Sequence, residues 1–420
     1  EKLQYLLFLV LGLGSYLKYF CYIAQTNYWT FFYKGQVLTI LNNVYAIGEL
    51  IGSIIVIPLE KRLNARVFAI LMLVIGGVSM MSIVPLKNIE NETAKYILTM
   101  IPIFLSANMT SILYPVLIAM SSRLDPLLSG ALQIGNGICE VIFQLLEDVI
   151  SIFVPEIEDP VKYERNLVLN ALIYYSSATV VLVFCFLVFV YAEKKFPACK
   201  IVRQKQTHIE MKLTNIISET NLETKSKNET NPKDKSEIPE YLEGDQQNQV
   251  QPKQSVLKRI WFFCFSLGVS YVFMTMLFPL FIVNVPNWAL VTKTGKTTTD
   301  LLNLLVLTVY TFCDFLGRII ASMKFMLKVK RGTIVFLCYF RVVLAVLFVL
   351  MNFPQYDGNG TKPIICSDFL FYTCLVLLAT TTTIVSTAGY QKYQELLDTD
   401  EEKTKGSYIL NLFLQLGLVV

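Results

Sequence analysis

The sequence predicts an all-α polytopic membrane protein with about eleven transmembrane helices, arranged as six spans, a polar linker and five spans. Of the 420 residues, 54% are hydrophobic and 16% are charged, whereas soluble domains carry about 25% charged residues. The mean hydropathy is +0.52. Apolar runs of about 20 residues, long enough to cross a bilayer, recur along the chain.

The apolar runs divide the chain into two bundles. The first six spans, which form an N-terminal bundle over 1–192, are predicted at 3–26, 37–59, 67–86, 96–120, 129–154 and 167–192. Residues 193–257 are rich in Lys, Glu, Asn, Gln and Thr and nearly lack aromatic residues, so we expect a disordered cytoplasmic linker. The C-terminal bundle, 258–420, holds spans at 258–283, 301–323, 332–353, 367–391 and 406–420, and we expect the last to be truncated.

Lysine and arginine residues in the loops predict the orientation. With the N-terminus inside, the inner loops and the linker ends hold about 18 of these residues, and the outer loops hold about 8. Because cytoplasmic loops carry the excess of positive charge, we expect a cytoplasmic N-terminus. The glycosylation sequons at Asn91 and Asn359 then fall outside, where acceptors belong.

Composition argues against several classes of function. The net charge of +4 is small and spread over loops, so nucleic acid is not an expected partner. The one histidine, His208, lies in the polar segment, which disfavours His-based metal sites and catalysis. We therefore expect no enzyme activity, no catalytic residue, no metal and no cofactor. About eleven spans also exceed what a seven-span receptor needs.

Asp314 and Arg318 are the strongest functional clue in the chain. They lie four residues apart in the span predicted at 301–323, so they share one helix face. A charge at membrane depth costs at least about 2.5–3.5 kcal/mol, so it usually faces a polar cavity or a partner. The structural alternative is an internal salt bridge that only braces the eighth span.

Further polar residues lie at a similar depth. Glu49, Asn108 and Asp314 each lie 12 or 13 residues from an outer span end, about 18–20 Å deep at 1.5 Å per residue. Glu140 and Arg341, counted from the inner side, reach the same region. These residues predict a central polar cavity between two half-bundles, as in alternating-access transporters. Glu49 and Glu140 could instead be helix-packing partners.

Several motifs resemble the equilibrative nucleoside transporter family. Asp314-Phe-Leu-Gly-Arg318 is similar to the eighth-span signature of that family, Asp-x-x-Gly-Arg. The first span, at 11–19, is similar to the family's Leu-Gly-Leu-Gly opening. Similar segments occur at 42–44, 126–130 and 411–418, where the second, fifth and eleventh spans begin. In this order the motifs cover nearly the whole chain apart from the linker.

The resemblance implies a fold and a set of site residues. It implies a major-facilitator-like arrangement of eleven spans, with Asp314 and Arg318 contacting ribose and base or helping to close the path. Tyr19 could stack on a base, although Lys18-Tyr19 replaces the Pro-Trp of the family. Asn108 is the nearest counterpart of a fourth-span amide, usually Gln, that reads the base. Other expected substrate-binding residues are Leu50, Ser53, Phe278 and Thr311, together with Glu49 from the polar belt.

We expect a membrane transporter for facilitated, equilibrative uptake of nucleosides, with purine nucleosides first and nucleobases as further candidates. An ionised Asp can accept from vicinal ribose hydroxyls, and Tyr or Phe can pack on a base. The alternative is a proton-coupled, major-facilitator-type carrier of sugars or other small polar solutes, which Glu49 and Glu140 motivate. We expect a monomer in the plasma membrane, with its substrate and the lipid bilayer as partners.

Overall fold

The computed structural model describes residues 2–33, 36–59, 65–153, 160–196, 255–277, 282, 285–294, 300–353 and 362–419. Regular structure within these ranges is helical, as predicted for an all-α membrane protein. The first half holds α1 (Lys2–Ser15), α2 (Leu17–Ala24), α3 (Thr26–Phe32), α4 (Val37–Leu59), α5 (Ala65–Leu86), α6 (Glu92–Leu124), α7 (Pro126–Phe153) and α8 (Pro160–Lys195). The second half holds α10 (Val256–Leu277), α12 (Trp288–Thr294), α13 (Asp300–Ser322), η3 (Lys324–Lys328), α14 (Arg331–Asn352), α15 (Asp368–Lys392), η4 (Tyr393–Leu396) and α16 (Asp400–Val419).

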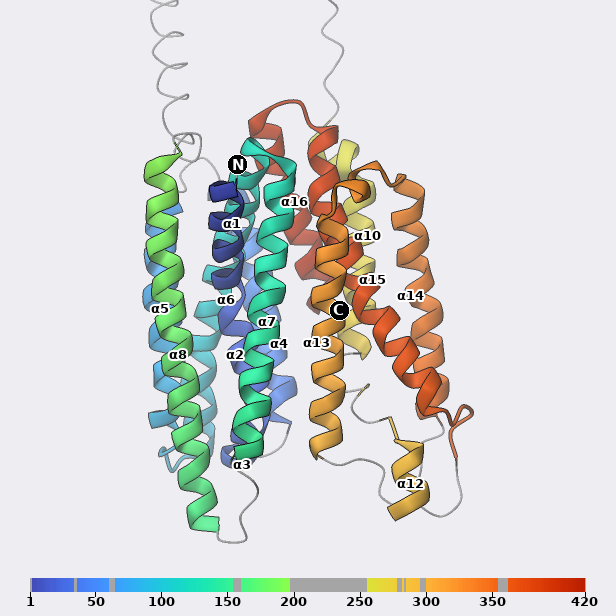
Figure 1. Ribbon diagram of the computed structural model, residues 1–420. Coiled ribbons are helices and arrows are strands. Elements are labelled where there is room, and N and C mark those ends of the chain that lie inside the picture. Colours follow the sequence, from blue (N-terminus) through green and yellow to red (C-terminus); the bar gives the residue numbers. More distant parts are fainter. Residues whose placement is uncertain are drawn as a thin grey trace, which may run out of the picture.

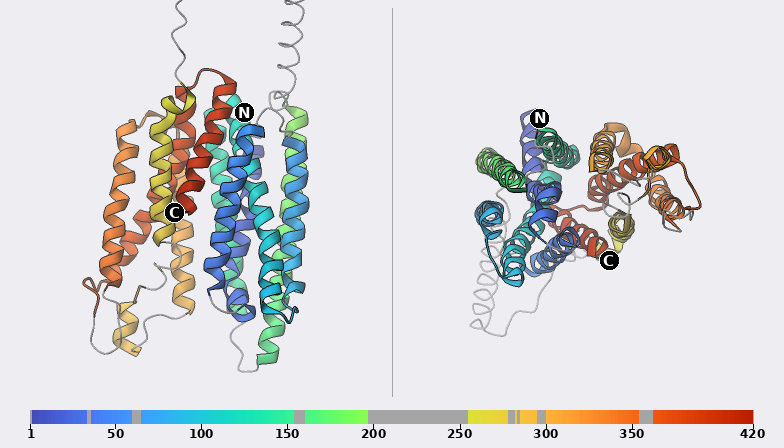
Figure 2. Two further views of the ribbon diagram at one scale, coloured as in Figure 1. Left: turned by 180° about the vertical axis from the view of Figure 1, so that it is seen from behind. Right: turned by 90° about the horizontal axis from the view of Figure 1, so that it is seen from below.

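Two bundles of helices lie side by side (Figure 1). In the first bundle α1 packs on α7 and α8, and α6 packs on α4 and α5. In the second, α10 packs on α14 and α16, and α15 packs on α13 and α14. The views from behind and from below separate the same two groups (Figure 2). The bundles meet where α7 contacts α13 and α15, and where α16 contacts α4 and α6.

Nine helices among the described residues are long and apolar enough to cross a membrane, and the bent pair of α1 and α2 brings the number to ten. The helix α16 is not among them. Its first turns carry Asp400, Glu401, Glu402, Lys403 and Lys405, so only its second part is apolar. The chain is therefore a multi-pass helical membrane protein, and an eleventh span at α16 stays a prediction.

The first predicted span is a bent pair of helices. The helices α1 and α2 meet at Tyr16 with an angle of 43°. Ser15 Oγ donates to the Gly12 carbonyl at 2.7 Å, a bond of the kind that bends helices. The backbones of α1 and α7 also approach so closely that a Cβ on Gly12 would lie 2.0 Å from the Leu132 carbonyl oxygen. This contact therefore requires glycine at position 12, because any Cβ would overlap the backbone of α7.

The ends of the bundles can be told apart by the chain itself. The N-terminus, the end of α8 and the start of α10 lie together at one end, and α3 and α12 lie at the other (Figure 1). We call these the N-terminal end and the far end. Most of the predicted linker, 193–257, lies outside the described residues, because α8 ends at Lys195 and α10 begins at Val256.

Candidate functional site

A cavity of about 1210 Å³, partly open to solvent, lies between the two bundles. Both bundles contribute polar and aromatic side chains to its wall. The polar residues are Asn42, Glu49, Gln133, Asn136, Glu140, Gln144, Thr311, Asp314, Arg318 and Thr382, and the aromatic residues are Tyr16, Tyr19, Phe20, Tyr45, Tyr114 and Tyr271. A concave site with an apolar body and a few placed polar groups is typical of small-molecule binding.

The bundles contact each other at the N-terminal end. Arg123 Nη2, at the end of α6, donates to Thr404 Oγ1 of α16 at 2.7 Å. Gln394 Nε2 of η4 donates to Ser129 Oγ of α7, also at 2.7 Å. These bonds join the two bundles on that side of the cavity.

Away from these contacts, the cavity extends toward the far end. Ala24, at the end of α2, and Asn42, near the start of α4, both line it. The helix α3, which connects α2 and α4, lies at the far end (Figure 1).

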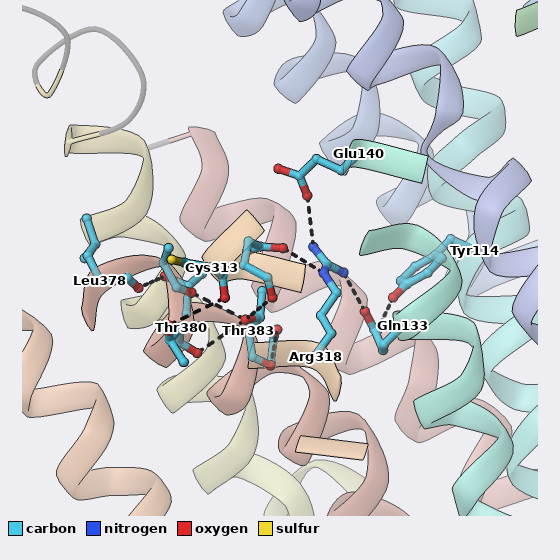
Figure 3. A network of polar contacts seen from close by, with 12 residues as sticks. Tyr114, Gln133, Glu140, Cys313, Arg318, Leu378, Thr380 and Thr383 are labelled. Carbon is cyan, nitrogen blue, oxygen red and sulfur yellow. Dashed lines mark hydrogen bonds and ion pairs between the residues drawn. The ribbon is translucent and has the colours of Figure 1, made fainter. Parts of the chain in front are cut away.

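Arg318 joins the two bundles at the cavity wall (Figure 3). Its Nε donates to Asp314 Oδ2 at 2.7 Å, one turn earlier on α13. On the other bundle, its Nη1 donates to Gln133 Oε1 of α7 at 3.1 Å, and its Nη2 lies 3.7 Å from Glu140 Oε2. Gln133 Nε2 in turn donates to the Tyr114 hydroxyl of α6. One guanidinium thus holds two carboxylates and an amide around the cavity.

The helix α15 supports the Asp314 segment from behind. Thr383 Oγ1 donates to the Asp314 carbonyl at 2.9 Å (Figure 3). At Gly317 the two helices approach so closely that a Cβ would lie 2.2 Å from Thr383 Oγ1 and 2.6 Å from the Thr380 carbonyl oxygen. The glycine of the Asp-x-x-Gly-Arg segment therefore permits the close packing of α13 on α15.

Aromatic residues cover the wall opposite α13. The Tyr19 ring lies 4.8 Å from the Tyr45 ring between centroids, and its hydroxyl donates to Asn42 Oδ1 at 3.1 Å. Tyr16, at the break between α1 and α2, makes an edge contact with Tyr114 at 4.9 Å. Aromatic faces of this kind can pack on a flat heteroaromatic ring.

Five of the substrate-binding residues predicted from the sequence line the cavity. They are Tyr19, Glu49, Thr311, Asp314 and Arg318. They come from α2, α4 and α13, so residues far apart in the sequence meet in one space.

The other predicted residues lie elsewhere. Asn108 Nδ2 donates to the Phe104 carbonyl of its own helix at 2.9 Å. Ser53 Oγ accepts from Asn411 Nδ2 of α16 at 2.8 Å, within a helix contact. Leu50 is half-buried and is not among the residues that line the cavity. Phe278 lies outside the described residues.

Arg341, at the predicted depth of the polar belt, lies behind the cavity wall. It is fully buried on α14, and its Nη2 donates to Thr382 Oγ1 at 2.6 Å. Thr382 itself faces the cavity.

The helix α7 supplies three cavity residues that the sequence analysis did not select, Gln133, Asn136 and Gln144, besides Glu140 of the predicted polar belt. Gln133, Asn136, Glu140 and Gln144 all line the cavity. Their spacing of three or four residues places them on one face of the helix, so they form a polar stripe in an apolar span. This stripe is the sequence signal that would have identified Gln133.

Comparison with known families gives one match that covers most of the chain. The sequence model described as "Nucleoside transporter" matches residues 100–420. That range includes Asp314, Arg318 and the polar stripe of α7. A search of curated proteins gave no significant match.

Solved structures of membrane transporters, two of them described as major facilitator superfamily proteins, share the fold. The Escherichia coli fucose:proton symporter FucP aligns with a TM-score of 0.53 at 14% identity, covering 99% of this chain and 88% of its own. The proton:xylose symporter XylE aligns at 0.57 and 10% identity, covering 98% and 86%. A bacterial homologue of the iron transporter ferroportin in the outward-facing state aligns at 0.58 and 8% identity, covering 98% and 89%. At these identities the likeness concerns the fold alone.

Proposed function

Because the chain belongs to the nucleoside transporter family, we propose that it mediates equilibrative uptake of nucleosides by alternating access. It is a membrane transporter rather than an enzyme. Purine nucleosides are the preferred substrates, and nucleobases are further candidates. The protein acts in the plasma membrane as a monomer, with the N-terminus in the cytoplasm. In that orientation the far end faces outside, and the cavity receives substrate from there.

One observation carries the proposal: Asp314 lies in the wall of a cavity between the bundles, fixed by Arg318. A carboxylate has about four acceptor positions, so Asp314 can accept from Arg318 and from a pair of ribose hydroxyls together. Because Arg318 donates its Nε to Asp314, the carboxylate is oriented before the substrate arrives. Thr311, one turn earlier on α13, adds a hydroxyl to the same wall.

The aromatic wall suits the base of a nucleoside. Tyr19 and Tyr45 lie on the bundle opposite Asp314, so a base can pack there while the ribose reaches α13. Small-molecule sites combine an apolar lining with a few placed polar groups, and the lining of this cavity has that character. Asn108, Leu50, Ser53 and Phe278 stay predictions, and the side chains of Asn108 and Ser53 bond to Phe104 and Asn411 outside the cavity lining.

Transport then follows from rocking of one bundle against the other. The contacts of Arg123 with Thr404 and of Gln394 with Ser129 would open as the far end closes over the substrate. Substrate and protein exchange only hydrogen bonds and packing contacts, so the concentration gradient of the nucleoside sets the direction.

The test is uptake of radiolabelled adenosine or inosine by a host that lacks its own nucleoside transporters. We expect saturable uptake that ends when internal and external concentrations are equal. Competition by unlabelled purine nucleosides, pyrimidine nucleosides and free bases ranks the substrates. Absence of uptake by protein that is present at the cell surface would refute the proposal.

A proton-coupled carrier of sugars or other small polar solutes is the second candidate. Glu49 and Glu140 line the cavity, and carboxylates at membrane depth can carry protons. Two structures that share the fold are described as proton symporters of fucose and xylose. Uptake that is unchanged by external pH and by membrane potential would dismiss this candidate.

A further inference from the structure

One corner of the cavity holds buried polar groups with no hydrogen-bond partner among the described residues. Glu49 is 2% exposed, and its Oε1 has none. Lys18 and Gln415 are fully buried. No hydrogen-bond partner is present among the described residues for Lys18 Nζ, Gln415 Oε1 or Gln415 Nε2. Glu49 lines the cavity, so a molecule inside can reach its carboxylate.

The three groups come from three elements. Lys18 lies on α2 and Glu49 on α4, both in the first bundle, and Gln415 lies on α16 in the second. The stem of Lys18 runs along α5, where a Cβ on Gly76 would lie 2.6 Å from its Cδ. Glu49 is the charged side chain that acts on Lys18, and Gln415 lies beside Glu49. Lys18 thus lies behind the cavity wall, and the carboxylate of Glu49 lies in the wall.

Gln415 is the amide donor placed beside the Glu49 carboxylate, but neither its Nε2 nor Glu49 Oε1 has a partner in hydrogen-bond geometry among the described residues. The titratable side chains facing it are Tyr16 and Tyr19 from the first span, Tyr45 from its own helix and Tyr114 from α6, besides Lys18. The hydroxyls of Tyr19 and Tyr45 donate to Asn42 and Thr110. A buried acceptor without a partner is unfavourable, so a ligand that donates to it gains binding free energy.

The resemblance to the transporter family implied that Asn108 reads the base, but its amide is bonded within its own helix. At that point α4 and α6 are in close contact, because a Cβ on Gly52 would lie 2.7 Å from the Asn108 carbonyl oxygen. Asn108 therefore does not present its amide to the cavity. Glu49, on α4, faces the cavity and has an acceptor to offer.

We propose that Glu49 is the specificity-determining residue for the base: its carboxylate accepts a hydrogen bond from an amino or ring N–H group of the nucleobase while Asp314 holds the ribose. Lys18 is a positioning residue, whose charge stabilises the carboxylate from behind. This assignment rests on the proposed function and names its substrate class. The substrates are nucleosides whose base carries an N–H donor on its hydrogen-bonding edge.

Adenosine and purine riboside form a matched pair for the test, because they differ only in the 6-amino group. The measurement is inhibition of radiolabelled adenosine uptake by each compound in proteoliposomes of the full chain. A hydrogen bond to a charged group is worth about 1.5–3 kcal/mol, so wild-type protein should favour adenosine by about tenfold to about a hundredfold. In Glu49→Gln this ratio should fall toward one, because the neutral amide is a weaker acceptor and also offers a donor.

Lys18→Met should lower the same ratio by at least about threefold while leaving affinity for purine riboside near wild type, since it removes charge and not shape. A purely structural defect would weaken both compounds equally. Glu90→Gln and Lys258→Met, at exposed positions, are the matched controls and should keep the wild-type ratio. Where Glu49→Gln transports too slowly, binding of both compounds to the purified variant gives the ratio.

Two outcomes would overturn the assignment: a wild-type ratio near one, or an unchanged ratio in Glu49→Gln. Each leaves the proposed function intact as long as wild-type protein takes up adenosine. Absence of uptake of any nucleoside by wild-type protein would instead refute the proposed function.

Discussion

Arg318 is the residue on which the charged contacts of the cavity converge. Its guanidinium binds Asp314 on its own helix and Gln133 and Glu140 on the opposite bundle. Arginine suits this position because it presents five donors in a fixed plane. A lysine would keep the charge and lose the geometry that reaches three partners.

Replacing Asp314 or Arg318 by alanine should abolish uptake while leaving protein detectable at the cell surface. Each change leaves the other charge buried without its main partner, a loss worth about 3–5 kcal/mol. Surface biotinylation and labelled adenosine uptake measure the two effects. Arg66→Ala is the control, because Arg66 pairs with Glu193 at a largely exposed position and should keep full uptake. Normal uptake by Asp314→Ala would leave the pair a purely structural role.

Tyr19→Ala should weaken nucleoside affinity more than Tyr19→Phe does. Alanine removes the ring that contacts Tyr45, whereas phenylalanine loses only the bond to Asn42. An aromatic contact is worth about 0.5–1.5 kcal/mol, which corresponds to about two- to tenfold in affinity. Competition binding to purified protein checks the order. Wild-type affinity in both variants would exclude stacking on Tyr19.

The sequence predicted the depth of polar residues in the membrane better than the helix face on which they lie. Counting from span ends placed Glu49, Asn108 and Asp314 at one level, yet Asn108 faces the contact between α4 and α6. One polar residue in an apolar span does not reveal which side of the helix it occupies. Several at helical spacing do, as on α7, and Gln133 could have been found in that way.

Helix boundaries were predictable because hydrophobic length is a local property. The predicted spans correspond to the described helices, with the first one bent at Tyr16. The bend lies beside the Ser15 Oγ bond to the Gly12 carbonyl, and the apolar pattern of the span does not specify it. Local sequence also explains why α16 is not among the helices apolar enough to cross a membrane, since its charged first turns reduce its hydropathy.

The contact between α13 and α15 makes a prediction about Gly317. Gly317→Ala should lower thermal stability and uptake, because its Cβ would overlap Thr383 Oγ1 and the Thr380 carbonyl oxygen. Overpacking costs about 1–3 kcal/mol. Gly332→Ala on α14 is the matched control, since nothing lies within 4 Å of its Cβ. Thermal unfolding in detergent should separate the two variants, and equal melting temperatures would contradict the packing account.

The relation of the two bundles is a property of the whole molecule, and composition alone does not predict it. The six-plus-five order follows from the position of the polar linker, but the pairing of α7 with α13 and of α16 with α4 does not. The resemblance to a transporter family supplied the major-facilitator-like arrangement. The solved transporter structures share that fold with this chain.

Arg123→Ala should shift the bundles toward separation at the N-terminal end, because it removes a bond that joins α6 to α16. Spin labels at the N-terminal ends of α5 and α14 measure the separation by pulsed electron resonance. We expect a larger population of long distances in Arg123→Ala than in wild type. Arg66→Ala, which breaks a contact within one bundle, should leave the distribution unchanged. An identical distribution in Arg123→Ala would show that the bond does not hold the bundles together.

The tie that Arg318 makes between α7 and α13 has a kinetic consequence. In a loaded transporter, bonds to the transported molecule can replace those bonds as the bundles move. An empty transporter must break them without any replacement. Reorientation of the empty transporter is then the slowest step of the cycle. Cells preloaded with unlabelled nucleoside should therefore take up labelled nucleoside faster than unloaded cells.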